Sequence, residues 1–376
     1  MTSVEAIKIL LDAREFTSSH FSGIGRVLQG LNASLAESTF CKQVSLAVHD
    51  PDALPLGVEL RGKVSIMEVP SSFLNSEKTL SRLSRHVDLY ISPYPKLPLF
   101  GCHCPCVHII HDVLDLTHPA YRRRIKKFFD LYRLRKALRR ANLTWYDSLW
   151  SMQETKELVG FAGRNPRVRF PGISDRFHLR RDEEKYQAIS KYDLDAGYIL
   201  VIGNGLPHKN LGVLLSISDQ ISRKLVFAGV PQKNQGLWKK KYPNKDAKWI
   251  EYVQDEYLPA LISNAFCLAQ PSTAEGYGYP PLEAMACGIP AVVSDIPVLM
   301  ETTGGNALVA KTNESKSWMD VFSALENNNI YQKQINKGLK WVNPLLGRKG
   351  WNTHIADIEA LLFQGSQARR KCFPGI

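Results

Sequence analysis

The chain has 376 residues, of which 44% are hydrophobic and 22% charged, and its formal net charge is +12. This composition excludes a disordered chain and predicts two or three domains, because one hydrophobic core rarely serves more than about 300 residues. The excess of 48 Lys and Arg over 36 Asp and Glu predicts an anionic partner, and seven cysteines, an odd number, favour reduced thiols. Apolar runs such as 198–203 are far shorter than the roughly 20 residues of a membrane-spanning helix.

Short β-rich runs alternate with helical patterns in the first 175 residues. The expected strands are 6–13, 43–50, 63–69, 88–94, 106–112, 143–148 and 167–172, with a helix at 23–38. Strands that alternate with helices favour a parallel sheet with helices on both faces. We therefore predict that residues 1–175 form a Rossmann-like domain.

The same alternation starts again after a polar segment at 173–195. Five further strands are expected at 198–203, 224–229, 248–253, 265–272 and 290–295. They predict a second doubly wound domain over residues 176–345 and a ligand cleft between the two domains. A last helix at 349–365 lies within residues 346–376, which we expect to pack back towards the first domain.

A strongly basic segment occupies residues 121–140, with ten Lys or Arg and one acid, Asp130. Its apolar residues have the spacing of a helical stripe: Ile125, Phe128, Phe129 and Tyr132. Such a helix can lie on an anionic bilayer, with aromatic rings in the interface and guanidinium groups on lipid phosphates. Alternatively, the stripe packs on its own domain and the basic face is solvated. No recognition module accompanies the helix, so we expect no nucleic-acid partner.

The stretch GCHCPCVHIIHD at 101–112 contains three cysteines and three histidines. On a strand, Cys102, Cys104 and Cys106 point to one face and His103 to the other, and a proline interrupts them. The side chains therefore converge poorly on a tetrahedral metal ion. We interpret the stretch as a loop leading into a buried strand, where cysteine behaves as a small hydrophobic residue.

The segment PSTAEGYGYPPLEAMACGIPAVVSD at 271–295 combines a strand end, a glycine-containing turn and a helix that begins near Pro280. Backbone amides of the turn and the helix dipole together predict an anion site suited to phosphate. Glu275 precedes the turn and Glu283 lies in the helix, so they would bracket a ligand with a central phosphate and hydroxyls at both ends. A nucleotide sugar is such a ligand. The structural alternative is that Glu275 caps the helix and Glu283 is solvated.

This segment resembles the signature of the family 4 retaining glycosyltransferases of the GT-B type, E-G-[aromatic]-G-x-P-x-x-E-A-M-A-x-G-x-P-V-V. Three other landmarks follow the family order: GIGRV at 23–27 resembles the N-terminal glycine loop, IHD at 110–112 the strand-end histidine, and IGNGLPHKN at 202–210 the phosphate-lysine segment. The resemblance covers nearly the whole chain. It implies an α/β GT-B fold of two doubly wound Rossmann-like domains with a ligand cleft between them.

The resemblance also implies individual roles. His111, Glu275 and Lys209 would be catalytic: Glu275 would contact the donor sugar near the reacting carbon, and Lys209 would neutralise the departing diphosphate. The residues implied in donor binding are Gly23, Gly25, Asn204, His208, Lys209, Glu275, Gly276, Tyr277, Gly278, Tyr279 and Glu283, the last on the ribose hydroxyls. Asn204 and His208 occupy places where many members carry an arginine, so less fixed positive charge is expected on the diphosphate unless His208 is protonated.

The N-terminal half supplies the rest of the expected site. His111 ends a strand at the carboxyl edge of the first sheet, where open α/β sheets place ligand groups, and the resemblance implies that it lies beside the transferred sugar. Asp112 would orient either the loop or His111. Arg14, Arg26 and Asp112 are expected on the acceptor side, although Arg14 could equally pair with Asp12.

The resemblance implies transfer of a sugar from a nucleotide-sugar donor, with GDP-mannose first, to a saccharide or lipid-linked acceptor in bacterial polysaccharide or lipopolysaccharide synthesis. A sugar-nucleotide epimerase of the same architecture and a catalytically silent nucleotide-sugar-binding protein are the alternatives. We expect no metal and no cofactor, because the acidic triplets at 50–52 and 193–195 lie away from the signature. Residues 1–16 have no basic region before their apolar run, so we expect the cytoplasm, with peripheral attachment to the inner face of the membrane.

Overall fold

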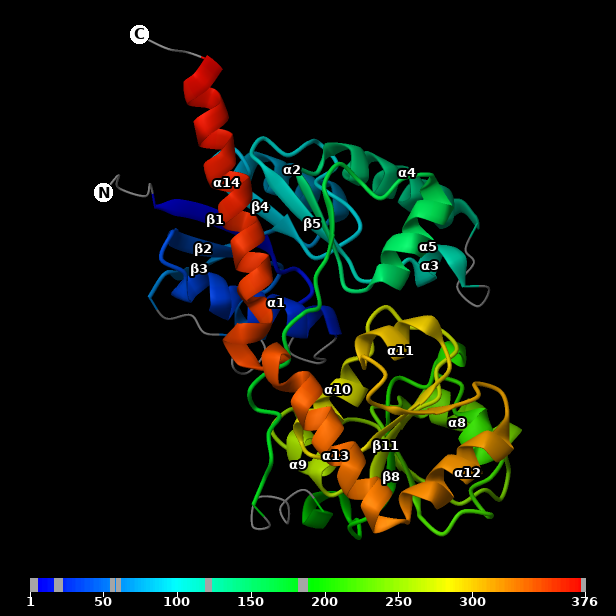
Figure 1. The fold of residues 1–376 in the computed structure, drawn as a ribbon. Coiled ribbons are helices and arrows are strands. Elements are labelled where there is room, and N and C mark those ends of the chain that lie inside the picture. Colours follow the sequence, from blue (N-terminus) through cyan, green and yellow to red (C-terminus); the bar gives the residue numbers. More distant parts are fainter. Residues whose placement is uncertain are drawn as a thin grey trace. The chain divides into compact units, whose positions relative to one another are not determined.

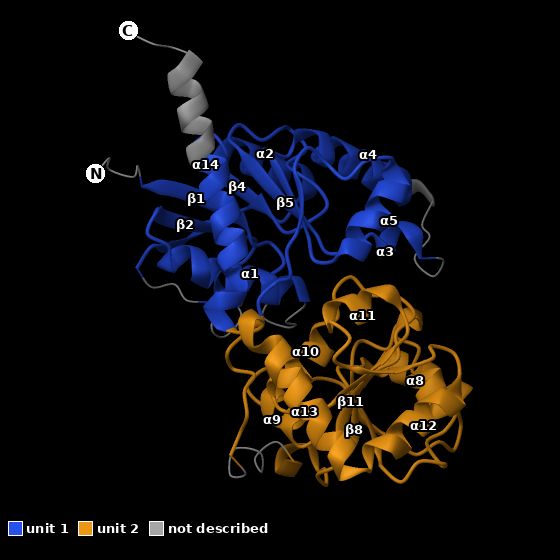
Figure 2. Cartoon of the chain, in the orientation of Figure 1, with its two compact units in different colours: residues 1–172, 347–376 blue, residues 173–346 orange. Residues whose placement is uncertain are grey.

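The computed structural model describes residues 6–16, 23–54, 58, 62–118, 124–181 and 189–372 (Figure 1). Positions 121–123 of the basic segment, 182–188 of the polar segment and the last four residues lie outside this part. The chain divides into two compact units, each described by itself. Unit 1 comprises residues 1–172 and 347–376, and unit 2 comprises residues 173–346 (Figure 2).

Unit 1 is built on a parallel sheet. Its described strands, in the order β3-β2-β1-β4-β5-β6-β7 across the sheet, are β1 (Ile7–Asp12), β2 (Cys41–Val48), β3 (Val64–Glu68), β4 (Leu89–Ser92), β5 (Cys106–Ile110), β6 (Leu143–Tyr146) and β7 (Pro166–Val168). The helices of this unit are α1 (Gly23–Glu37), η1 (Pro51–Ala53), α2 (Phe73–Leu83), α3 (Leu114–Thr117), α4 (Arg124–Arg140), α5 (Leu149–Val159), η5 (Gly347–Trp351) and α14 (Asn352–Cys372). The strand order reverses direction between β1 and β4, as in a doubly wound sheet.

Unit 2 repeats this plan with the strand order β10-β9-β8-β11-β12-β13. The strands are β8 (Ile199–Ile202), β9 (Leu225–Ala228), β10 (Lys248–Ile250), β11 (Cys267–Gln270), β12 (Ala291–Ser294) and β13 (Leu308–Ala310). The helices are η3 (Pro207–Lys209), α7 (Gly212–Leu215), α8 (Gln232–Lys241), α9 (Leu258–Ser263), α10 (Tyr279–Ala286), α11 (Pro297–Thr302), α12 (Ser315–Leu325), α13 (Asn328–Val342) and η4 (Asn343–Leu345). Every residue of β9, β11 and β12 is buried, as in parallel strands covered on both faces.

The α/β fold with two parallel sheets confirms the fold-class prediction. Strand β13 was not expected, because it has only three residues and one of them, Val309, is exposed. Most of the expected strands are shorter than their sequence runs, and β4 and β10 are two examples. Strand β4 ends at Ser92, where Pro93 follows and has no N–H for a further ladder bond, and β10 ends at Ile250.

The C-terminal segment is anchored on unit 1 by one tryptophan and one aspartate. The Trp351 indole packs on Gly30 and Gly172 so closely that an added Cβ would lie 2.6 and 2.4 Å from it. Asp357 in α14 accepts hydrogen bonds from Trp145 Nε1 (3.0 Å) and from Arg169 Nε (2.9 Å). These contacts tie the start of α14 to α1 and to the segment that follows β7.

The face of helix α4 that is buried differs from the face that carries the predicted apolar stripe. Its buried side chains are Leu134, Leu138, Ala137 and Arg133, which contact the core beneath β4 and β5. Phe128 is 78% exposed and Tyr132 is 54% exposed, so the alternative in which the stripe packs on its own domain is wrong for these two residues. Among the described residues, no helix is both long enough and apolar enough to cross a bilayer.

Candidate active site

The signature segment forms the turn between β11 and α10 in unit 2. Gly278 adopts φ = 86° immediately before α10, and an added Cβ would lie 2.5 Å from the Leu299 side chain, so only glycine fits this position. Tyr277 and Tyr279 on either side are buried and form an edge-to-face pair with ring centroids 5.0 Å apart. The turn is therefore rigidly packed, and it presents the amino end of α10 at the carboxyl edge of the sheet.

Both signature glutamates are buried, at 8% exposure for Glu275 and 1% for Glu283. The N-cap position of α10 is Gly278, which has no side chain that could cap the helix. The burial of Glu283 contradicts the part of the structural alternative in which this residue is solvated. Two buried carboxylates require compensating partners, since isolated buried charge is costly.

Glu275 is held by a set of donors that converge on its Oε1 atom. Lys209 Nζ lies 2.6 Å away, Ser272 Oγ donates at 2.6 Å, and the Gln270 side-chain amide also donates to it. Burial by itself would raise the pKa of Glu275. The charge and hydrogen bond of Lys209 and the hydrogen bond of Ser272 outweigh burial, so the pKa is lowered and the carboxylate is ionised.

The phosphate-lysine segment lies next to this turn. Lys209 ends η3, which follows β8, and its stem lies against Gly203, where an added Cβ would be 3.3 Å from the Lys209 Cδ atom. The backbone carbonyl of His208 accepts a hydrogen bond from Thr273 N at 2.8 Å, which ties η3 to the signature turn. Asn204 is exposed and its side chain accepts from Leu206 N at 3.2 Å, so it shapes the turn after β8. The structure thus brings Lys209, Glu275 and His208 together within unit 2.

In unit 1, His111 follows β5 and is paired with an aspartate that sequence reasoning missed. The distance from His111 Nδ1 to Asp147 Oδ2 is 2.6 Å. The Nε2 atom on the other side of the ring is buried, and the ring also lies within hydrogen-bonding reach of the Pro93 backbone carbonyl. Burial opposes the charged ring, but Asp147 and, to a smaller extent, Asp112 outweigh it, so the pKa of His111 is raised.

The other expected residues of unit 1 belong to three separate segments of the chain. Asp112 Oδ1 accepts a hydrogen bond from Leu114 N at 2.9 Å, so it orients the loop, whereas the direct partner of His111 is Asp147. Arg14 pairs with Asp12 at 2.7 Å and also donates to Ser76 Oγ at 2.9 Å. The residues of the expected glycine loop begin α1: Gly23 is exposed, Gly25 is buried and Arg26 is partly buried.

Replacing Asp147 by asparagine is expected to lower the pKa of His111, because the neutral amide removes the closest negative charge while keeping the side-chain shape. The shift is measured by NMR titration of the histidine ring resonances. The matched control is Asp112→Asn, which should shift the same pKa less, since Asp112 makes no hydrogen bond to the ring. A larger shift in the control would show that the Asp147 contact does not set the ionisation of His111.

The three cysteines of the 101–112 stretch pack as small apolar groups. Cys102 and Cys106 are buried in one core cluster with Leu97, and Cys104 packs at its edge. Cys102 Sγ and Cys104 Sγ lie 3.9 Å apart as free thiols. In the part of the chain that the structure describes, no group of three or more His, Cys, Asp or Glu side chains is arranged to hold a metal ion.

Comparison with known proteins identifies sequences that are similar to this chain. Residues 182–341 match the family model of glycosyl transferases group 1. The O-antigen chain mannosyltransferase B of Escherichia coli is 31% identical over 220 residues, which are 55% of this chain and 58% of that protein. The O-antigen chain mannosyltransferase RfbU of Salmonella typhimurium is 30% identical over 160 residues, 39% of this chain and 45% of that protein. The aligned part thus spans about half the length of these curated relatives.

A solved structure extends the likeness to the whole fold. The crystal structure of Anabaena Alr3699/HepE in complex with UDP-glucose covers 94% of this chain and 99% of its own, with a TM-score of 0.74 and 17% sequence identity. A likeness at this identity shows the fold, and the fold is GT-B. Residues 182–341 therefore resemble the glycosyl transferases group 1, within a chain that has the GT-B fold.

Proposed function

We propose that the chain is a retaining hexosyltransferase that moves a sugar from a nucleotide-sugar donor to a saccharide or lipid-linked acceptor in polysaccharide or lipopolysaccharide synthesis. The observation that carries this proposal is the ionised Lys209–Glu275 pair beside the amino end of α10. It places a cation and a hydrogen-bond acceptor together at the edge of the sheet, which suits a ligand that joins a diphosphate to a sugar. The mannosyltransferase relatives make GDP-mannose the first candidate donor.

In the proposed reaction, Lys209 acts on the leaving group. The bond between the anomeric carbon and the phosphate oxygen breaks, and the negative charge that develops on the diphosphate is stabilised by the Lys209 ammonium and the α10 amides. Contact with Glu275 holds Lys209 in position before a donor arrives, so little reorganisation is needed. The acceptor oxygen forms its bond on the same face of the sugar, and its proton passes to the departing phosphate.

His111 is proposed to orient the transferred sugar. Asp147 fixes one ring nitrogen, so the buried Nε2 atom keeps a defined direction for a hydrogen bond to a sugar hydroxyl. The raised pKa increases the fraction of His111 rings that are protonated, and in a protonated ring both nitrogens carry an N–H that can donate to a sugar hydroxyl. The proposed place of the reaction is the cytoplasm, at the inner face of the membrane.

A panel of nucleotide sugars, measured by thermal shift, tests the donor. The true donor should raise the melting temperature by mass action, and GDP-mannose is expected to exceed UDP-glucose. Release of nucleoside diphosphate that depends on an added acceptor supports transfer, and the anomeric configuration of the product tests retention. Interconversion of the donor without an acceptor would instead identify an epimerase, and binding without either outcome a catalytically silent protein.

A further inference from the structure

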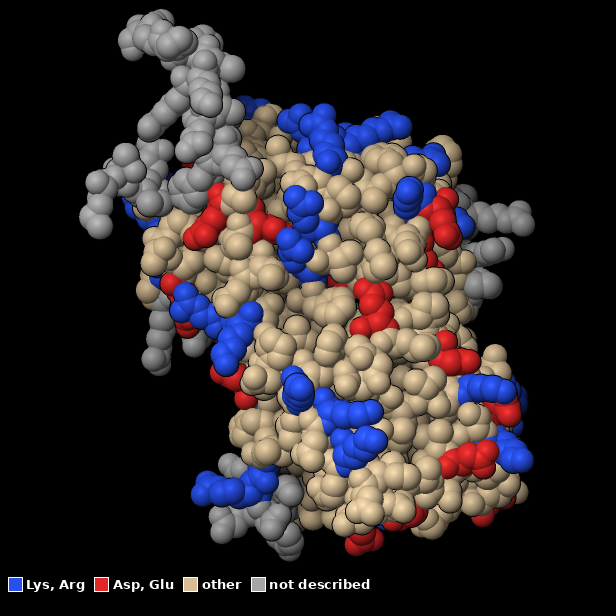
Figure 3. Space-filling model, viewed as in Figure 1, with Lys and Arg blue, Asp and Glu red and all other residues tan. Residues whose placement is uncertain are grey.

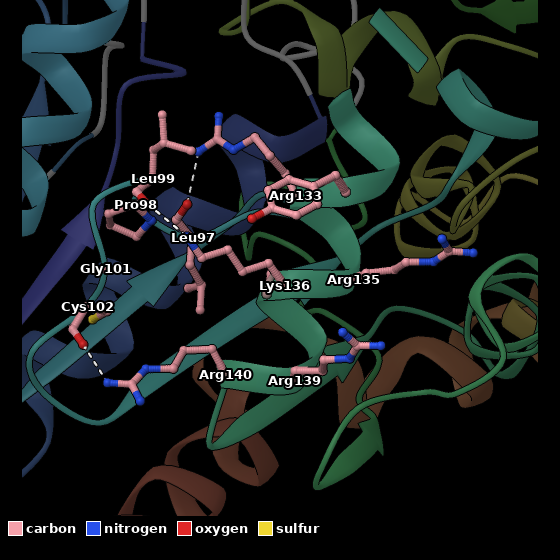
Figure 4. Close-up of a pocket in the computed structure, with 12 residues that line it drawn as sticks. Leu97, Pro98, Leu99, Gly101, Cys102, Arg133, Arg135, Lys136, Arg139 and Arg140 are labelled. Atoms are coloured by element: carbon pink, nitrogen blue, oxygen red, sulfur yellow. Dashed lines mark hydrogen bonds between the residues drawn. The ribbon is translucent and has the colours of Figure 1, made fainter. Parts of the chain in front are cut away.

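A pocket of about 520 Å³ in unit 1 lies between α4 and the segment 97–102, outside the residues proposed for transfer (Figure 4). Leu97, Pro98 and Ala137 give it an apolar lining. The polar part of its lining consists mainly of cations of α4: Arg133, Arg135, Lys136, Arg139 and Arg140. The pocket carries no acidic side chain in its lining, so its chemistry suits a ligand that combines an anionic group with apolar surface.

Three of the five cations build the walls of this pocket. Arg133 is buried and donates to Glu77 Oε2 at 2.7 Å and to the Leu97 carbonyl at 2.9 Å. Lys136 Nζ donates to the Leu99 carbonyl at 3.1 Å, and Arg140 donates to the Cys102 carbonyl at 3.1 Å, as Figure 4 shows. These bonds fix the 97–102 segment against α4, so the pocket is a preformed part of the fold.

The other two cations, Arg135 and Arg139, have no acidic partner within the described residues. Arg139 lies over the Phe161 ring at 5.8 Å, and Arg135 is exposed. They are four residues apart on one helix, where like charges repel each other. α4 as a whole carries eight Lys or Arg and one acid over Arg124–Arg140, so its own acids cannot neutralise this face. An external anion would relieve the repulsion.

Exposed aromatic side chains adjoin the basic pocket. Phe128, Phe129 and Tyr132 are 78%, 40% and 54% exposed, and Tyr132 also lines the pocket. Phe129 pairs edge to face with Phe73 of α2, which is itself 48% exposed. Figure 3 shows Lys and Arg side chains gathered over the α2 and α4 side of unit 1. Aromatic rings that stay exposed beside guanidinium groups match the membrane interface, where the acyl region and lipid phosphates meet.

We propose that the pocket between α4 and segment 97–102 binds the phosphate of an anionic bilayer phospholipid, while Phe128, Phe129 and Tyr132 enter the same leaflet. Arg135 and Arg139 contact the phosphate, and the apolar lining accommodates the adjoining glycerol and the first acyl carbons. This docking surface lies in unit 1, whereas the residues proposed to bind the donor diphosphate lie in unit 2. The lipid proposal therefore does not depend on the proposed transfer reaction.

Sedimentation with lipid vesicles tests whether Arg135 and Arg139 contribute to the binding of anionic lipid. The full chain should bind vesicles that contain phosphatidylglycerol, and should bind pure phosphatidylcholine vesicles far more weakly. The double variant Arg135→Gln/Arg139→Gln should bind the anionic vesicles about thirtyfold less tightly, since each cation near such a leaflet contributes roughly fivefold. The matched control is Lys233→Gln/Lys240→Gln, which removes the same charge from exposed positions of α8 in unit 2. An equal loss in this control would overturn the proposal.

A second variant tests whether the exposed aromatic side chains enter the bilayer. Phe128→Ala should weaken vesicle binding about tenfold, because one exposed phenyl ring no longer transfers from water into the interface. Leu237→Ala, at an apolar position of α8 that is 63% exposed, is the control and should bind as the unaltered chain does. A circular dichroism spectrum and a melting temperature equal to those of the unaltered chain, both measured without any donor, confirm that each variant is folded. Equal binding to both vesicle types, or equally tight binding to a short oligonucleotide, would contradict the lipid assignment.

Discussion

Replacing Glu275 by alanine is expected to reduce the rate of sugar transfer by a factor of about 10²–10³, while nucleoside diphosphate binds at least as tightly as before. The Glu275 carboxylate is buried, ionised and 2.6 Å from Lys209. Removing it takes away the proposed contact to the donor sugar, which lowers the rate. It also removes a negative charge next to the cation that would hold the diphosphate, which strengthens diphosphate binding.

Steady-state kinetics and calorimetric titration with the nucleoside diphosphate separate the two effects. Lys209→Ala should weaken diphosphate binding as well as the rate, because it removes the cation itself. The control is Glu326→Ala, which breaks an ion pair of similar length in the same unit, between Glu326 and Arg223 at 2.7 Å. Transfer at an undiminished rate by the Glu275 variant would overturn the assignment of this site, and equal losses in the Glu326 variant would indicate damage to unit 2 as a whole.

Local sequence patterns predicted the elements that carry the site. Continuous apolar runs identified the buried parallel strands, and the turn with Gly278 before α10 followed from the spacing of glycine and proline in the signature. These patterns carry information only about residues that are close together in the sequence. Strand ends were harder to predict: β10 ends at Ile250 although the expected run continues to Val253, and β13 has only three residues.

Partners that depend on strand register could not be predicted. Ile110 of β5 is register-paired with Tyr146 of β6, and His111 and Asp147 are the next residues of those two strands. Their contact is therefore a consequence of sheet register, which one sequence does not reveal. The same holds for Lys209 and Glu275, which are 66 residues apart and meet because β8 pairs with β11.

The sequence pattern of α4 also did not predict which of its faces is buried. Its periodicity offered an aromatic stripe through Phe128 and Tyr132, but the helix packs through Leu134 and Leu138. Tertiary context decides between two possible faces, because only one of them meets the core under β5 and β6. The aromatic stripe therefore stays exposed beside the basic pocket. An exposed apolar patch of this kind is a candidate binding surface.

Replacing Glu77 by alanine is expected to destabilise unit 1 by about 3–5 kcal/mol, because the variant leaves buried positive charge without its partner. Glu77 in α2 is 1% exposed. Its carboxylate accepts from Arg133 of α4 at 2.7 Å and from the Leu99 amide at 2.7 Å, and it lies 3.4 Å from Arg14. One side chain therefore joins α2, α4, the segment after β1 and the 97–102 segment.

Urea unfolding of the full chain, followed by circular dichroism, measures this loss as an earlier transition of unit 1. The control is Glu37→Ala, which breaks the exposed pair between Glu37 and Arg348 and should cost less than about 1 kcal/mol. Adding Arg133→Met to the Glu77 variant should restore part of the stability, since both members of the buried pair are then removed. A Glu77 variant no less stable than the Glu37 variant would show that the network does not hold the four segments together, and the pocket beside α4 would lose its structural support.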